Sequence, residues 1–438
     1  MTGHSYGAAA KMQTPWGDIV ELKERRLPPG PGSDPAERDR NQRERLFGAT
    51  VIGTAKSGYS ALRVEDLIAL AGVSRATFYR HFDDKGDCFR ATVEALLGKG
   101  LEAVEAALEE SQPLARRLES AVHAVLAMVA AEPVAARICL LDSYAAGRDG
   151  TKPIEEALTQ ACEVAHDALV QLPEYEKTPP AIAQAVIGGL HRVMYTYLWQ
   201  GRESELPALA PRLVEWATSF PPPVPGIDRR PRQPKLRPHI GAEPALGRDP
   251  HERMIRSFAE AVSRHGLTHT TISQIAAAGS ISQTTFYRHF KDKEDALEAA
   301  LDLSGAQLLA AALPSARRAS SWPVAIRRAL EAALAFLAAE PSFARLRAVE
   351  VYGAGPRAIA KRDVAWNQIL AELIPEEVRE VDALRLAAGA GANYALMYKK
   401  VREGSLEDLP NLVPTATYII LSPLLGSSEA ARVALAPL

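Results

Sequence analysis

Apolar residues recur along this chain at spacings of three and four, the period of an α-helix, and no stretch alternates between apolar and polar as a strand does. Long runs rich in Ala, Leu, Val, Glu and Arg end at Pro or Gly, which stop helices. The pattern therefore predicts an all-α protein. In the first half we expect about nine helices, near residues 36–57, 63–71, 75–81, 84–110, 113–131, 134–145, 152–171, 179–200 and 205–219.

The sequence also contains a long internal repeat. The hexapeptide Thr-Phe-Tyr-Arg-His-Phe occurs at residues 77–82 and again at 285–290, an offset of 208. The same offset aligns the Ala-Glu-Pro at 131–133 with that at 339–341, so the similarity spans a domain. Further on, a few residues are lost from a loop and the offset becomes 203, which aligns Gly201 with Gly404. We therefore expect two copies of one helical unit of roughly 190 residues.

Composition limits the class of protein. Of the 438 residues, 47% are apolar and 24% are charged, as in soluble globular proteins. No run of about 18 uncharged apolar residues predicts a membrane span, and the N-terminus lacks the features of a secretory signal. We expect a cytoplasmic protein with no membrane partner. The three cysteines have no metal-ligand spacing, so we expect free thiols, no metal and no cofactor.

Residues 63–93 carry the clearest local signal. Leu67 and Ile68 give a short helix an apolar face, a tight turn follows at residues 71–73, and Ser74 can cap the next helix through its hydroxyl. On that helix Phe78 and Phe82 lie four residues apart and face inward. Two short helices joined in this way predict a helix-turn-helix, whose second helix, called here the reading helix, enters the major groove of DNA.

The second copy repeats this layout over residues 271–301, with one difference at the turn. Ser280 stands where the first copy has Gly72, and Gly279 stands where it has Ala71. Glycine is the residue that most readily adopts the left-handed conformation of such turns. We therefore expect the second turn to be shifted or looser.

Both segments resemble the DNA-binding region of the TetR/AcrR family of bacterial transcriptional regulators. The resemblance rests on the Ala-Gly-Val-Ser turn of the first copy, on the Thr-x-Tyr-x-His-Phe of both and on the lysine that follows. It implies that each copy has a three-helix, helix-turn-helix DNA-binding domain and a larger helical domain that binds an effector and dimerises. The expected DNA-binding residues are Arg63, Ser74, Arg75, Thr77, Tyr79, His81 and Lys85 in the first copy and Thr271, Ser282, Gln283, Thr284, Thr285, Tyr287, His289 and Lys293 in the second.

The chain is accordingly predicted to have seven parts. They are a flexible N-terminal arm (1–34), a first DNA-binding domain (35–83), a first regulatory domain (84–220), a Pro- and Arg-rich linker (221–247), a second DNA-binding domain (248–291), a second regulatory domain (292–425) and a C-terminal tail (426–438). The basic arm could enter a minor groove, but a solvated extension is favoured. The two DNA-binding domains are called head 1 and head 2 below.

Members of the family usually pair as homodimers, whereas this chain fuses two copies. We expect a covalent pseudo-dimer that binds a quasi-palindromic operator, as a repressor, with further self-association left open. Helices near 179–219 would pack on those near 382–421 as a four-helix bundle. The apolar residues there fit this bundle and an intradomain core equally well: Val186, Ile187, Val193, Met194, Leu198 and Leu213 in the first copy, and Leu386, Leu396, Met397, Val401, Leu412 and Ile419 in the second.

The two reading helices begin differently. The first copy has Arg75 where the second has Gln283. Arginine favours guanine and glutamine favours adenine, each through two hydrogen bonds. We therefore expect two unlike half-sites in the operator.

Amphipathic helices of the larger domains could enclose a small apolar effector, whose chemical class the sequence leaves open. The candidate pocket residues are Met128, Tyr144, His166, His191, Tyr195, Phe336, Tyr352, Trp366 and Tyr394, although each fits a core position as well. The heads are nearly neutral, with a charge of +1 over residues 35–98, so a helical interaction or ligand-sensing module with degenerate heads is the first alternative. An enzyme is the second, and neither a phosphate loop nor a nucleophile elbow favours it.

Overall fold

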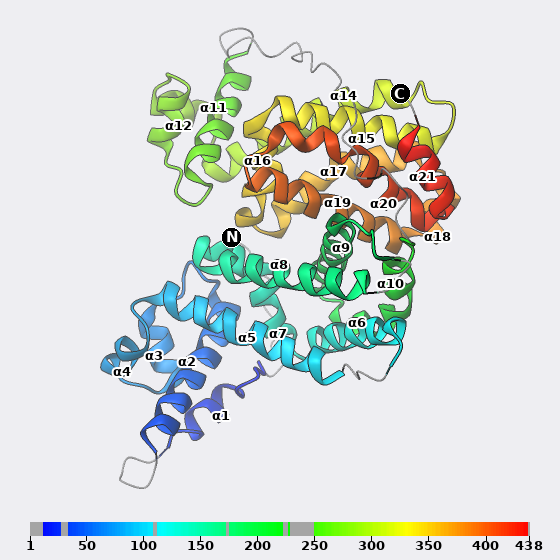
Figure 1. Cartoon of the computed structure of the whole chain (residues 1–438). Coiled ribbons are helices and arrows are strands. Elements are labelled where there is room, and N and C mark those ends of the chain that lie inside the picture. Colours follow the sequence, from blue (N-terminus) through cyan, green and yellow to red (C-terminus); the bar gives the residue numbers. More distant parts are fainter. Residues whose placement is uncertain are drawn as a thin grey trace. The chain divides into compact units, whose positions relative to one another are not determined.

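The computed structural model describes residues 12–27, 34–107, 112–171, 175–221, 227 and 249–436, and every regular element within them is helical (Figure 1). The all-α prediction is confirmed. The chain divides into two compact units, which are Met1–Gln160 with Met194–Val214 and Ala161–Val193 with Glu215–Leu438. The second unit therefore contains a segment of the first copy as well as the whole of the second. Most of the predicted linker, 221–247, lies outside the described residues.

Head 1 opens the first unit. Its helices are α1 (Ile19–Glu24), α2 (Pro35–Ser57), α3 (Val64–Ala71) and α4 (Arg75–His81). Asp34 caps α2 by accepting a hydrogen bond from the Ala36 N–H at 3.2 Å, and Pro35 occupies the first turn, where its missing N–H leaves no bond unmade. The capped α2 is the central helix of the head.

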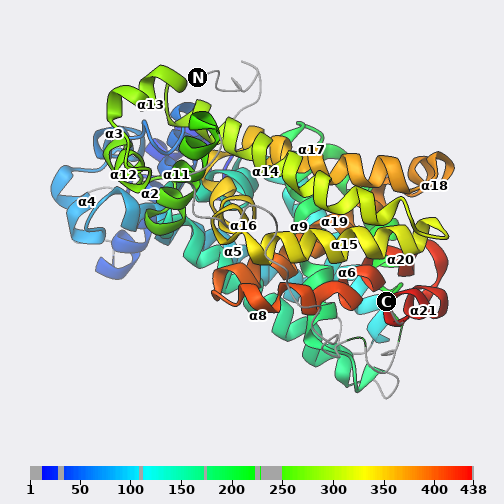
Figure 2. The same cartoon turned by 90° about the horizontal axis from the view of Figure 1, so that it is seen from above.

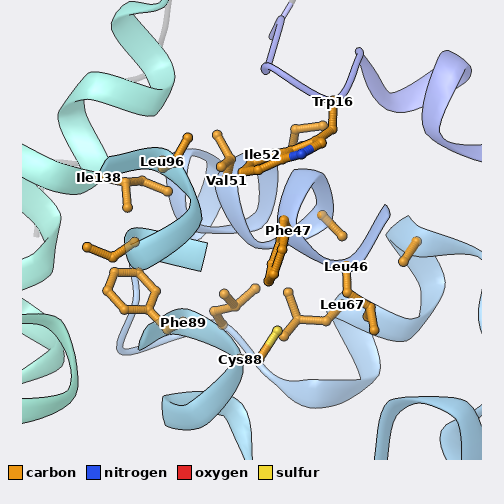
Figure 3. Packing of buried hydrophobic residues seen from close by; sticks show 14 of the residues in the cluster. Trp16, Leu46, Phe47, Val51, Ile52, Leu67, Cys88, Phe89, Leu96 and Ile138 are labelled. Carbon is orange, nitrogen blue, oxygen red and sulfur yellow. The ribbon is translucent and has the colours of Figure 1, made fainter. Parts of the chain in front are cut away.

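The core of head 1 forms around α2. Figure 3 shows Leu46, Phe47, Val51 and Ile52 of α2 packed with residues of the neighbouring helices, and all four are buried. Phe47 lies 6.1 Å from Phe82, between ring centroids, at a tilted angle typical of packed aromatic pairs. The core therefore holds the end of the reading helix against α2.

Part of the predicted flexible arm belongs to this core, which corrects the prediction for residues 12–27. Trp16 is buried and its ring centroid lies 5.2 Å from that of Phe47. Leu22 of α1 is fully buried against Gly48. Arg25 donates to the Trp16 carbonyl at 2.6 Å and so closes the segment. The aromatic and apolar anchors stabilise α1, which is too short to be stable alone.

The first copy continues with helices that carry no DNA-reading element. In chain order they are α5 (Lys85–Ala107), α6 (Leu114–Ala131), α7 (Pro133–Arg137), the π-helical turn η1 (Ile138–Asp142), the 3-10 helix η2 (Ser143–Ala146), α8 (Arg148–Val170), α9 (Pro180–Trp199), the 3-10 helix η4 (Glu203–Leu209) and α10 (Ala210–Ala217). They match the predicted ranges closely, with two exceptions: the helix expected over 134–145 is broken into α7, η1 and η2, and the one expected over 205–219 is divided into η4 and α10.

Head 2 lies in the second unit and consists of α11 (Pro250–His265), α12 (Ile272–Ala278) and α13 (Gln283–His289) (Figure 2). The helices that follow are α14 (Lys293–Ala316), α15 (Trp322–Ala339), α16 (Pro341–Ala348), the 3-10 helix η5 (Glu350–Ala354), α17 (Pro356–Leu373), α18 (Glu376–Val381), α19 (Ala383–Arg402), the 3-10 helix η6 (Leu406–Leu412), α20 (Val413–Leu425) and α21 (Ser427–Leu435). Residues 427–435, expected within a tail, thus form a helix, and Ala430, Val433 and Ala434 bury its apolar face.

Among the described residues, α14 is the one unbroken helix that is long and apolar enough to cross a membrane. Half of that stretch is buried inside the protein. Its neighbours are α15 and α17, which pack along it. These contacts are those of a core helix, because a core helix is apolar on every face that its neighbours cover.

Within the second unit, the α9 segment of the first copy crosses α19 of the second copy at small residues. A Cβ added to Gly188 would collide with Ala395, and one added to Gly391 would collide with Arg192. Gln184 donates to the Ala395 carbonyl at 3.1 Å. The close approach of the two backbones therefore depends on glycine at both positions.

Candidate nucleic-acid interface

Both reading helices begin with the same serine cap. In α4 the Thr77 N–H donates to Ser74 Oγ at 3.0 Å, and in α13 the Thr285 N–H donates to Ser282 Oγ at 3.0 Å. The two hydroxyls of each pair also lie within hydrogen-bond distance, at 2.8 Å and 2.9 Å. These four residues, predicted to contact DNA, thus also fix the start of each reading helix.

The second turn was expected to be shifted or looser. It is not shifted, because its left-handed residue and its closing bond stand at equivalent positions in both heads, although α12 ends one residue earlier than α3. Gly72 has φ +61° and Ser280, its equivalent, has φ +51°. The Val73 N–H donates to the Ile68 carbonyl at 3.2 Å, and the equivalent bond in head 2 measures 2.9 Å. Ser280 therefore adopts the left-handed conformation without glycine, at a cost of about 1 kcal/mol.

Gly279 compensates for a neighbouring change. A Cβ at Gly279 would collide with the hydroxyl of Ser257 on α11, and the first head has Ala49 and Ala71 at the two equivalent positions. In head 2 Gly279 faces the larger Ser257, whereas in head 1 the two equivalent residues are both alanine. Close packing of α12 on α11 is thus preserved.

The reading helices present one face inward and another outward. Phe78 and Phe286 are fully buried, and Phe82 and Phe290 nearly so. Tyr79 and Tyr287 are 49% and 58% exposed, and each packs edge-on against the phenylalanine before it. Large aromatic side chains held rigid at the surface suit contact with a nucleic-acid backbone or base edge.

The first residue of each reading helix is held by the preceding helix. Arg75 forms an ion pair with Glu65 of α3, and Gln283 donates to the Ser273 hydroxyl of α12 at 2.8 Å. Both acceptors lie ten residues earlier. Arg75 and Glu65 are both well exposed, so the pair contributes little to stability.

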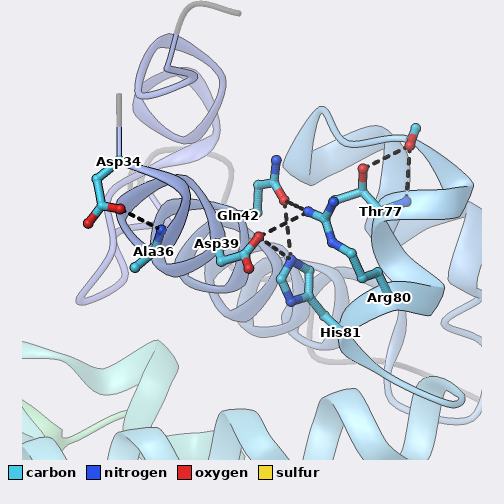
Figure 4. A network of polar contacts seen from close by, with 8 residues as sticks. Asp34, Ala36, Asp39, Gln42, Thr77, Arg80 and His81 are labelled. Carbon is cyan, nitrogen blue, oxygen red and sulfur yellow. Dashed lines mark hydrogen bonds and ion pairs between the residues drawn. The ribbon is translucent and has the colours of Figure 1, made fainter. Parts of the chain in front are cut away.

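His81 does not project freely from α4. Its side chain is only 7% exposed, and its ring lies 3.2 Å from Gln42 Oε1 of α2 (Figure 4). The neighbouring Arg80 of α4 donates to Asp39, which like Gln42 lies on α2, at 3.1 Å. Burial, together with the charge of Arg80, lowers the pKa of His81, so its ring is neutral at pH 7. This contact braces the reading helix against α2 and was not predicted from the sequence.

In head 2 the same position pairs with a different residue. His289 Nδ1 lies 3.4 Å from His251 Nδ1 on α11, and the two rings are tilted by 35°. One nitrogen donates and the other accepts. In both heads a histidine of the reading helix contacts the preceding long helix, but its partner is Gln42 in head 1 and His251 in head 2.

Lys85 and Lys293 were expected at phosphates; Lys85 holds the loop between α2 and α3, and Lys293 holds the equivalent loop between α11 and α12. Lys85 Nζ donates to the carbonyls of Tyr59 and Leu62 at 2.9 Å and 3.0 Å, and it lies 4.3 Å from the centroid of the Tyr59 ring. Lys293 makes the equivalent bonds at 3.2 Å and 2.8 Å. Burial lowers the pKa of both lysines. In the structure both lysines thus hold a loop of their own head.

Arg63 and Thr271 start α3 and α12 in different ways. Thr271 accepts from the Gln274 N–H at 3.3 Å while Gln274 accepts from the Thr271 N–H at 2.8 Å, which completes a capping box. At Arg63 only the second half exists, since Asp66 accepts its N–H at 2.9 Å. Arg63 and Thr284 are exposed.

The candidate pocket residues are divided between the units. Met128, Tyr144 and Tyr195 belong to the first, and His166 and His191 belong to the second. Burial lowers the pKa of His191 to about 4, so its ring is neutral at physiological pH. In the second copy, Trp366 and Tyr394 line a cavity of ≈ 50 Å³, whereas Phe336 and Tyr352 lie outside its lining. Arg347 and Asn393 also line it and were not predicted.

Two capped reading helices, each after a tight turn and each with an exposed rigid face, define a helix-turn-helix DNA-binding protein. The model of the bacterial regulatory proteins of the tetR family matches residues 54–92 and 259–300, one match in each head. The chain belongs to this family of transcriptional regulators and contains its DNA-binding domain twice, in tandem.

Solved structures similar to this chain include other bacterial regulators. The fatty acid degradation regulator FadR from Bacillus halodurans is 18% identical over 44% of this chain and 96% of its own, with a TM-score of 0.37. FadR from Bacillus subtilis, solved in complex with stearoyl-CoA, is 20% identical over 40% of this chain and 97% of its own, with a TM-score of 0.37. A transcriptional regulator from Rhodococcus sp. Rha1 is 19% identical over 42% of this chain and 99% of its own, with a TM-score of 0.35. No curated protein matches the chain.

Proposed function

We propose that this protein is a repressor that binds a quasi-palindromic operator through two unlike heads of one chain. In this proposal the two copies pair within the chain, as a homodimer pairs between chains. A small effector in the regulatory domains releases the DNA. The observation that carries the proposal is the reciprocal contact of α9 with α19.

A two-fold interface is recognised by reciprocity: if residue i contacts j, the equivalent of j contacts the equivalent of i. At the offset of 203, Gly391 is the equivalent of Gly188 and Ala395 is the equivalent of Arg192. Gly188 faces Ala395, and Gly391 faces Arg192. The two contacts are thus equivalent under exchange of the two copies, which supports an internal pseudo-two-fold axis.

The contacts of the second unit also support pairing near the ends of the copies. Ser422 Oγ donates to the Ser219 carbonyl at 2.6 Å, and Tyr418 packs its ring 6.2 Å from that of Phe220. Leu396, Met397, Val401 and Leu412, considered for the bundle, line the intradomain cavity instead. The small-residue faces of the two helices, and not these larger residues, support the pseudo-dimer.

The difference between the heads supports an asymmetric operator. Arg75 carries a guanidinium that matches guanine, and Gln283 carries an amide that matches adenine. Tyr79 and Tyr287 are exposed beside them and are proposed to contact the backbone. The base preference of the two heads is expected to differ because Arg75 and Gln283 differ. Affinity is expected to fall as salt rises, as it does for proteins that contact phosphates.

A gel shift with the DNA that flanks the protein's own gene tests the proposal. We expect a specific complex that weakens as salt rises and that survives competition by unrelated DNA. Arg75→Ala should lose discrimination at a guanine in one half-site only, and Gln283→Ala should act on the other half-site. A complex no tighter than that with unrelated DNA would contradict the proposal.

A further inference from the structure

The cavity of the second unit has a polar wall that the first copy does not share. Arg347 of α16 and Asn393 of α19 line the cavity. At offsets of 208 and 203, the first copy has Cys139 and Leu190 at these positions. Burial raises the pKa of Cys139 to about 12, so its thiol is neutral. The second copy thus places a cation and an amide where the first has two uncharged side chains.

The cavity wall belongs to a buried cluster with excess positive charge. Arg347 is 4% exposed and Arg362 is fully buried. Arg362 Nε donates to Asp363 Oδ1 at 2.8 Å, and Arg192 also pairs with Asp363. Arg362 and Arg192 share the carboxylate of Asp363, and Arg362 also lies 3.8 Å from the centroid of the Tyr394 ring. Arg347 makes no ion pair with a carboxylate in the described part of the chain, so it brings positive charge that an anion would offset.

Arg347 is held in place but is not neutralised. It donates to the carbonyl of Leu301 at 3.3 Å, to the Ser304 hydroxyl at 3.2 Å and to the carbonyl of Arg362 at 2.8 Å. Its acceptors are all uncharged, and burial lowers its pKa. A guanidinium fixed by neutral groups beside a cavity is arranged to bind an anion.

Two further cavity residues carry buried polar atoms without a hydrogen-bond partner in the described part of the chain. They are the Trp366 Nε1–H, a donor, and Asn393 Oδ1, an acceptor. Asn393 Nδ2 donates to the Ala416 carbonyl at 3.3 Å, which orients the amide. Leaving such groups unpaired is unfavourable, so a ligand that pairs both is favoured.

The remaining lining is apolar and the space is small. Leu330, Leu334, Leu337 and Met397 are among the lining residues. A volume of ≈ 50 Å³ holds on the order of four water molecules. The ligand body is therefore small and apolar, and a long acyl chain does not fit this conformation.

We propose that the second copy alone binds a small organic acid with an apolar body and a hydroxyl group. Its carboxylate pairs with Arg347 and accepts from the Trp366 Nε1–H, and its hydroxyl donates to Asn393 Oδ1. The regulatory consequence rests on the proposed repressor function, but the binding itself does not. Effector sensing is thereby confined to one half of the chain.

The experiment uses the full chain and measures thermal stabilisation and binding heat without DNA. The probes are 3-hydroxybenzoate, its methyl ester and the aliphatic acid 2-hydroxy-4-methylpentanoate. We expect at least one of the two acids to raise Tm and to bind. The ester, which lacks the charge, should bind about ten-fold more weakly than 3-hydroxybenzoate or not at all.

Two variants and one matched control test the residues. Asn393→Leu installs the residue of the first copy and should weaken binding about five-fold or more, and Arg347→Met should abolish it. Cys139→Ala changes the equivalent of Arg347 in the first copy and should leave binding unchanged. If Arg347→Met fails to fold, Asn393→Leu with the ester comparison still tests the site.

The proposal is overturned if neither acid stabilises the protein at millimolar concentration, if the ester binds as tightly as the acid, or if Asn393→Leu binds normally. A gel shift with and without the acid tests the repressor function separately from the binding site. Binding of the acid without any specific DNA complex would overturn the repressor function and leave the site standing.

Discussion

Ser422 donates its hydroxyl to the backbone carbonyl of Ser219 at 2.6 Å, and the two serines are equivalent residues of the two copies. In a two-fold interface, a residue near the axis meets its own equivalent. Away from the axis, the contact of Gly188 with Ala395 is matched by the equivalent contact of Gly391 with Arg192, as a two-fold axis also requires. These contacts are the physical basis on which we propose a dimer built from one chain.

Enlarging the two glycines should break this pairing. In the double variant Gly188→Leu, Gly391→Leu, both side chains would collide with the facing helix, and overpacking of this kind destabilises by about 1–3 kcal/mol. We expect loss of stability in urea together with an operator affinity at least ten-fold lower. Gly98→Ala, in an open position on α5, is the control: it should raise stability by about 0.5–1 kcal/mol, as alanine does in a helix interior, and leave operator affinity unchanged. Normal DNA affinity in the double variant would argue against internal pairing.

The left-handed serine of head 2 should be a site of simple stabilisation. Ser280→Gly removes the steric penalty of a Cβ at φ +51° and should raise the free energy of unfolding by about 1 kcal/mol. Gly72→Ser makes the opposite change in head 1 and should lower it by a similar amount. Urea denaturation of both variants measures this. An unchanged midpoint in both would show that the turn relaxes.

The N-terminal anchor should matter for the stability of head 1. Trp16→Ala removes a buried aromatic side chain that packs on Phe47, which typically destabilises by about 3 kcal/mol or more. Val20→Ala, on the exposed side of α1, should change stability by less than about 0.5 kcal/mol. Hydrogen exchange of α2 amides distinguishes the two variants. Equal protection in both would mean that the segment is dispensable.

A buried carboxyl should give the first unit a pH-dependent stability. Burial raises the pKa of Asp142 from 3.8 to about 6, although Arg137 opposes the shift. A carboxyl with a raised folded-state pKa contributes its stability below pH 3.8 and loses it as the pH rises through 6. Asp142→Asn should therefore stabilise the protein at pH 7, and its advantage should be about 2 kcal/mol smaller at pH 4.5. Urea denaturation at both pH values measures the difference, and an advantage that does not change with pH would contradict it.

The sequence predicted the features whose causes are local. The reading helices follow from the cap residues Ser74 and Ser282 and from the phenylalanines four residues apart, all within one or two turns. The repeat follows from identity at a fixed offset. The fold class follows from the period of the apolar residues.

The rest depends on contacts between residues far apart in the chain. Trp16 appeared to belong to a solvated arm because its partner, Phe47, lies on another helix. Lys85 was assigned to a phosphate because no pattern reveals that the carbonyls of Tyr59 and Leu62 meet its ammonium group. The pairing surface was sought among large apolar residues, whereas close helix crossing requires small ones such as Gly188. No local pattern marks Arg347 as a cavity residue, because its partners Leu301, Ser304 and Arg362 lie 15 to 46 residues away in the chain.

Selection of bound sites from a random duplex library, followed by native mass spectrometry of the selected complex, tests whether one chain reads the operator with two unlike heads. We expect one chain per duplex and a motif of two unlike half-sites, with the guanine preference of one half-site lost in Arg75→Ala. Two chains on each duplex, or a perfect palindrome bound as tightly as the mixed site, would contradict it.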